Sequence, residues 1–181
     1  MSKPQDDLSY IRASLEELET YLLSKDLFWP VSTPAGMRTF PKLTLGNLLL
    51  AIKKLNAYTG PAVQREYSQI TGDVEVIHNK WTTAWENKAS REFGSRLRQW
   101  THYLNDLQKN EETHAPYYPF EIRVRVLIAL LDEFAAADDQ QALTQLDVAL
   151  QAKLTRSVFI WEPELQPEFP QDKFWFLYGK I

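Results

Sequence analysis

The chain has 181 residues, of which 44% are hydrophobic and 24% charged, and its formal net charge at pH 7 is -4. This balance is typical of a folded globular protein and excludes wholesale disorder, and the negative charge argues against a general binder of polyanions. There is no cysteine, which excludes disulfides, thiolate metal sites and cysteine nucleophiles and is consistent with a cytoplasmic location.

No segment of the sequence predicts a membrane association. The first ten residues, MSKPQDDLSY, have no apolar core of the kind that signal peptides contain. No apolar run approaches the roughly 20 residues that a membrane-spanning helix needs. Aromatic residues make up 13% of the chain and there are only six glycines, which favours helices packed through large side chains. We therefore expect a soluble, all-α protein.

The first half begins with two helices separated by a loop. Leucine and isoleucine recur at helical spacing over residues 5–24. Residues 25–43 hold three prolines and a glycine, which predicts an ordered loop. A second helix is expected over residues 44–59, with Thr44 as its N-cap. The Thr-Gly-Pro sequence at 59–61 then ends this helix and begins the next one.

The segment 61–109 is unusually long for a helix without proline. Its apolar residues recur at steps of four and three, first over positions 63–84 and then, in a shifted phase, over positions 93–107. A straight helix of this length would extend about 70 Å, whereas a compact chain of this size has a radius of gyration of about 16 Å. We expect a break or bend near residues 71–73. If the helix were unbroken, it would project and form a homodimer along its first apolar seam.

The second half is predicted to complete a single helical domain, a bundle of about five helices. A polar linker is expected at residues 110–118, followed by helices at 119–137 and 139–159. Residues 160–181 form a proline-linked aromatic tail.

The sequence is compatible with three structures for the tail. Residues 173–178 are strong β-formers that could pair with residues 157–161. The tail could instead be a hook that binds a partner protein. Alternatively it folds back on the bundle, which we favour because burial of three of its side chains would contribute about 5–8 kcal/mol. The residues that would contact a partner in the second case are Phe174, Trp175, Phe176 and Tyr178.

Metal-binding patterns are present but weak. Glu75 and His78 lie on one helical face, as do Glu111 and His114, and such pairs bind metal in di-iron helical bundles. The lone glutamates that this site also requires are not evident, so solvated helix faces are the better interpretation. We expect no metal and no cofactor.

A basic stripe interleaved with tryptophans runs along the predicted long helix. If this segment is one helix, its cations could follow the phosphates of a nucleic acid while a tryptophan stacks on a base. The simpler interpretation is that the tryptophans belong to the apolar seams and that the cations pair with acidic neighbours. The candidate nucleic-acid-binding residues are Lys80, Lys88, Arg91 and Arg98.

The function that we predict from the sequence is non-enzymatic. The long helix, the excess of aromatic residues and the lack of a catalytic motif favour a protein–protein interaction or assembly module, acting on another protein or as a homodimer. A nucleic-acid-associated helical protein is the alternative, and a metal-dependent helical-bundle enzyme is the third possibility.

Overall fold

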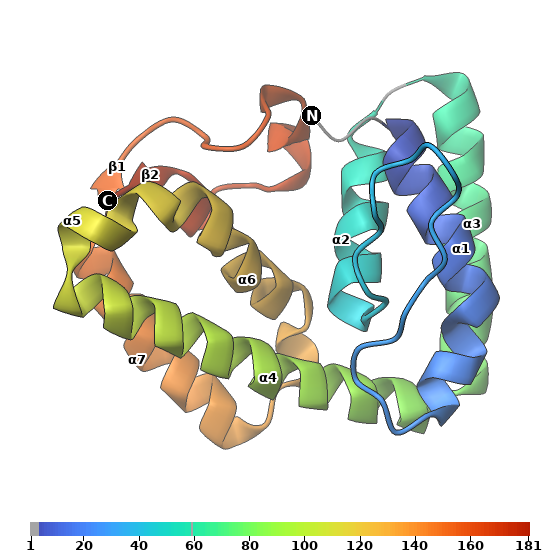
Figure 1. Ribbon diagram of the computed structural model, residues 1–181, viewed down its shortest axis with the longest axis horizontal. Helices are drawn as coiled ribbons and strands as arrows, with labels where there is room; N and C mark the ends of the chain where they lie inside the picture. Colours follow the sequence, from blue (N-terminus) through green and yellow to red (C-terminus); the bar gives the residue numbers. More distant parts are fainter. Residues whose placement is uncertain (1–3, 59) are drawn as a thin grey trace. The chain divides into compact units, whose positions relative to one another are not determined.

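The computed structural model describes residues 4–58 and 60–181 (Figure 1). Within these residues the chain forms seven α-helices, four short 3-10 helices and one pair of two-residue strands, which confirms the predicted all-α class. None of the helices in the described part is both long enough and apolar enough to cross a membrane. Thr59, the predicted end of the second helix, lies outside the described residues.

The chain divides into two compact units, one ending at Glu92 and the other beginning at Phe93. The first unit comprises α1 (Pro4–Leu23), α2 (Leu45–Asn56), α3 (Pro61–Lys80) and the first turns of α4 (Thr82–Lys109). The second comprises the rest of α4, α5 (Glu111–His114), α6 (Tyr118–Leu130), α7 (Ala137–Lys153) and the tail, with its strands β1 (Thr155–Arg156) and β2 (Gly179–Lys180).

In the first unit α1, α2 and α3 contact one another and enclose an apolar core (Figure 1). Thr44 is the N-cap of α2 as predicted, because its hydroxyl accepts a hydrogen bond of 3.1 Å from the backbone N–H of Asn47. Pro61 lies in the first turn of α3, also as predicted. The loop over residues 25–43 is fixed by an antiparallel bridge between Trp29 and Leu43.

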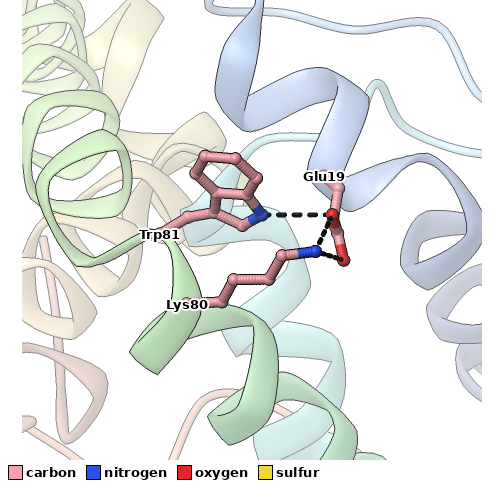
Figure 2. A network of polar contacts seen from close by, with 3 residues as sticks. All are labelled: Glu19, Lys80 and Trp81. Carbon is pink, nitrogen blue, oxygen red and sulfur yellow. Dashed lines mark hydrogen bonds and ion pairs between the residues drawn. The ribbon is translucent and has the colours of Figure 1, made fainter.

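The helix break lies at Trp81, and the prediction of a break near residues 71–73 is wrong. Gly72 lies inside α3, since one glycine costs a helix only about 1 kcal/mol. Trp81 leaves the helical conformation, with φ -123° and ψ 39°. Its indole N–H donates to Glu19 Oε2 at 3.1 Å, and Lys80 Nζ lies 3.0 Å from the same oxygen (Figure 2). This tertiary anchor fixes where the chain turns.

Because of the bend at Trp81, the first apolar seam packs against its own chain. The seam residues are half-buried, and one of them, Ile70, is fully buried. The unbroken, projecting helix that predicted a homodimer is therefore not formed. The seam residues are Val63, Tyr67, Ile70, Val74, Ile77, Trp81 and Ala84.

Three predicted boundaries in the second half are wrong. Residues 110–118 are not an open linker, because Asn110 caps the short α5 and a 3-10 turn follows at Ala115–Tyr117. The helix expected over 119–137 ends at Leu130, before a 3-10 turn at residues 132–134. The helix expected over 139–159 spans Ala137–Lys153 instead, since the chain becomes extended at Leu154 to pair β1 with β2.

The C-terminal tail folds back on the second unit, as we favoured. Phe174, Phe176 and Leu177 are buried. The Tyr118 hydroxyl donates to the carbonyl of Phe176 at 2.7 Å. The alternative strand over residues 173–178, paired with residues 157–161, is not formed, because residues 175–177 form a 3-10 turn. The strand pair joins Gly179–Lys180 to Thr155–Arg156 instead. A Cβ at position 179 would overlap the side chain of Leu154, so the close approach requires glycine there.

Candidate functional site

The predicted basic stripe does not form one exposed face in the first unit. Lys80 belongs to α3 and pairs with Glu19, whereas Lys88 and Arg91 follow the break, in α4. Arg98 is exposed and lies in the second unit. Lys80 could share a helical face with Lys88 and Arg91 only if α3 and α4 were one continuous helix. The turn at Trp81 separates the two helices.

Lys88 is a buried residue, with only 2% of its surface exposed. Its ammonium donates to the carbonyl of Asp26 and to the hydroxyl of Ser24, and it lies 4.4 Å from the ring centroid of Tyr21. Burial lowers the pKa of Lys88, and the nearby charge of Arg91 lowers it further. Such a group is not available to a phosphate backbone.

A basic hollow of about 520 Å³ surrounds this lysine. Two of its three cations already bind the chain segment that follows α1: Arg91 donates to the carbonyl of Lys25 at 3.1 Å, and Lys88 to that of Asp26. Cations near a helix C-terminus stabilise its carbonyl groups and its dipole. This hollow therefore has a structural explanation. It is lined by Leu22, Leu23, Ser24, Lys25, Ala84, Asn87, Lys88, Ser90 and Arg91.

The weak metal candidates are not assembled into a site. Glu75 is exposed, and the half-buried His78 stacks on Trp85 with a centroid separation of 4.6 Å. Among the described residues, no group of three or more histidine, aspartate or glutamate side chains is placed to hold a metal ion. These two residues thus have no third ligand in the described part of the chain.

A second hollow, of about 510 Å³, lies in the second unit between α4 and the chain that leads into α6. Four of its residues lie on one face of α4, at helical spacings of three, one and three. The others come from α5, from the 3-10 turn and from the first turn of α6. We call it the α4–α6 hollow; it is lined by Gln99, His102, Tyr103, Asp106, His114, Tyr117 and Glu121.

The floor of the α4–α6 hollow is held in place by Tyr103. This side chain is buried, its ring lies 5.4 Å from that of Trp100, and its hydroxyl donates to the carbonyl of His114 at 3.3 Å. Burial raises the pKa of Tyr103, and the charge of Glu121 raises it further. Tyr103 is therefore a neutral hydrogen-bond donor that ties the turn to α4.

The α4–α6 hollow contains two carboxylates, Asp106 and Glu121, and no lysine or arginine is among its lining residues. Asp106 lies 3.5 Å from His102 Nε2 and 3.6 Å from Lys109 Nζ. Glu121 is half-buried, and no hydrogen bond or ion pair joins its side chain to any residue in the described part of the chain. Its position in the first turn of α6 favours a negative charge, because the helix dipole is positive there.

Two exposed aromatic residues lie close to Glu121 in the sequence. Tyr117 lines the hollow and is 57% exposed, and Phe120, one residue before Glu121, is 76% exposed. The sequence pattern did not predict this surface, because the polar residues and prolines of 110–118 are typical of a linker. The sequence feature that could have indicated this surface is the run Tyr-Tyr-Pro-Phe at 117–120, where aromatic residues interrupt a polar segment bounded by prolines.

The predicted partner-binding residues of the tail divide into two pairs. Phe174 and Phe176 are buried within the second unit, so a partner could reach them only by displacing the tail. Trp175 and Tyr178 are half-buried and line a shallow hollow of about 220 Å³. Any contact made by the folded tail must therefore use the second pair.

No family model, curated protein or solved structure matches this chain.

Proposed function

We propose that this chain is a non-catalytic protein–protein interaction module that binds its partner through the surface around the α4–α6 hollow. The observation that carries the proposal is the exposure of Tyr117, which lines the hollow, and of Phe120, the residue before Glu121 in the chain. Other phenylalanines of the second unit are far less exposed than Phe120: Phe93, Phe169 and Phe176 are inaccessible to solvent, and Phe134 is half-buried. Single exposed apolar residues are ordinary on protein surfaces, but aromatic residues exposed close to one another are typical of an interface.

The energetics of covering this surface support a protein partner. Burial of one phenylalanine side chain contributes about 1.5–3 kcal/mol, and aromatic residues are enriched among those that dominate binding. Tyr117 adds a second aromatic ring that is more than half exposed. Tyr117 offers an aromatic contact within a polar hollow and Phe120 a second exposed ring three residues later, and interfaces commonly combine apolar contacts with a polar margin.

The composition of the hollow favours binding over covalent catalysis. Its lining contains no serine, threonine or cysteine that a histidine could activate. The hydroxyl of Tyr103 is engaged with a carbonyl, and its raised pKa makes it a poor nucleophile. The alternative proposal, nucleic-acid binding, is weakened by the burial of Lys88 and by the pairing of Lys80 with Glu19.

Site-specific photo-crosslinking tests the proposal. A benzophenone amino acid replaces Phe120 in the full chain, expressed in the cells that naturally produce it. The matched control carries the same group at Val148, which is 64% exposed on α7 of the same unit. We expect a discrete protein adduct from position 120 that is absent from position 148. Equal adducts from both positions, or none from position 120, would contradict the proposal.

A further inference from the structure

The carboxylate of Glu121 has no cationic partner among the described residues, although it lies in a site where a cation would be stabilised. It is half-buried in the α4–α6 hollow and has no hydrogen-bond or ion-pair partner among the described residues. A carboxylate that is partly withdrawn from water interacts more strongly with a nearby cation than a fully solvated one does. The free chain therefore presents a charge that a ligand can neutralise.

The rest of the lining also selects a cation. Asp106 supplies a second carboxylate, and its neighbours His102 and Lys109 are 3.5 and 3.6 Å away, longer than charge-assisted hydrogen bonds. Tyr117 supplies an exposed aromatic ring, and such rings attract cations placed over their faces. The hollow repels phosphate for the same reason that it attracts an ammonium or guanidinium group.

We infer that the α4–α6 hollow binds an arginine side chain of the partner protein, while an apolar residue beside that arginine covers Phe120. This inference rests on the proposed function. Arginine fits better than lysine, because its planar guanidinium can bind a carboxylate through two hydrogen bonds and can also stack on tyrosine. A polypeptide fits better than a small amine, because it can also cover Phe120, an exposed aromatic residue that does not itself line the hollow.

The test uses the purified full chain and two synthetic peptides. One is acetyl-Gly-Leu-Arg-Leu-Gly-amide, and the other carries citrulline, the neutral analogue of arginine, at the central position. Binding is measured by NMR titration of the backbone amides. We expect the arginine peptide to shift amides between residues 99 and 121 and to bind about fivefold more tightly than the citrulline peptide. Equal affinities, or no binding by the arginine peptide, would overturn the inference.

Two variants and a third ligand locate the interaction. Glu121→Gln should lower the affinity for the arginine peptide about fivefold, with no change for the citrulline peptide. Glu112→Gln removes a carboxylate from α5 that does not line the hollow, and it should change neither affinity. If acetyl-arginine amide alone binds as tightly as the peptide, the hollow is a small-molecule site and the commitment to a protein segment is wrong.

The inference and the proposed function fail in different ways. Photo-crosslinking from position 120 requires only a protein partner. If that adduct forms equally in the Glu121→Gln chain and maps to a partner segment without arginine, the arginine hypothesis is wrong and the interaction module stands. Loss of the adduct in Glu121→Gln, with an arginine in the mapped segment, supports both.

Discussion

Replacement of Phe176 by alanine tests whether the tail is part of the fold of the second unit. Phe176 is fully buried, its ring lies 4.5 Å from the guanidinium carbon of Arg125, and its carbonyl accepts a hydrogen bond from Tyr118. A buried phenylalanine replaced by alanine loses its transfer free energy and leaves a cavity, at a total cost of about 3–5 kcal/mol. The backbone hydrogen bond to Tyr118 is retained, so the measured loss reports on packing.

Phe120→Ala is the matched control, because it removes the same atoms from a side chain that is mostly exposed. We expect this control to change the free energy of unfolding by less than about 0.5 kcal/mol. Urea denaturation followed by circular dichroism measures both variants. Phe176→Ala should also lower the melting temperature by about 6–20 °C. If the two variants have the same stability, the tail does not belong to the core and the hook interpretation regains its basis.

Three further predictions concern buried polar groups. Glu92→Ala should lower the free energy of unfolding by about 1.5–3 kcal/mol, because the buried carboxylate accepts a 2.8 Å hydrogen bond from the backbone N–H of Gly46 at the start of α2. A loss below about 0.5 kcal/mol, measured by urea denaturation, would contradict this. Asp147→Ala should cost about 3–5 kcal/mol, since it leaves Arg125 buried without its two hydrogen bonds of 2.9 and 2.7 Å, and the double variant Arg125→Met/Asp147→Leu should recover much of the loss. Burial raises the pKa of three tyrosines, so they stabilise the fold below their unfolded pKa of about 10, and this stability is lost as the pH rises through their folded pKa values. Their ionisation, followed by tyrosinate absorbance, should coincide with alkaline unfolding; ionisation of all tyrosines while the circular dichroism stays native would refute this. The three are Tyr21, Tyr103 and Tyr118.

The local sequence pattern predicted the all-α class and the starts of α2 and α3, because the causes of these features are local. The N-cap at Thr44 and the proline that opens α3 each act within one helical turn. The break at Trp81 could not be predicted this way, since its anchor is Glu19, 62 residues earlier in the chain. The glycine at position 72 was the stronger local signal, and a tertiary contact overrode it.

The candidate site was less predictable than the fold. The four lining residues on α4 follow helical spacing, but nothing in their pattern shows that His114 and Glu121 join them. That juxtaposition depends on the 3-10 turn at Ala115–Tyr117 and on the hydrogen bond from Tyr103 to the turn. Burial of Lys88 was missed for a similar reason, because its hydrogen-bond acceptors, Ser24 and Asp26, lie more than 60 residues away in sequence.

Hydrogen–deuterium exchange on the chain bound to its crosslink-identified partner shows whether the partner covers the α4–α6 hollow. We expect the partner to slow amide exchange in residues 111–123, around Tyr117, Phe120 and Glu121, and to leave exchange in residues 172–181 unchanged. Exchange that is unaltered at 111–123 and slowed in the tail, or in the basic hollow around Arg91, would contradict this expectation.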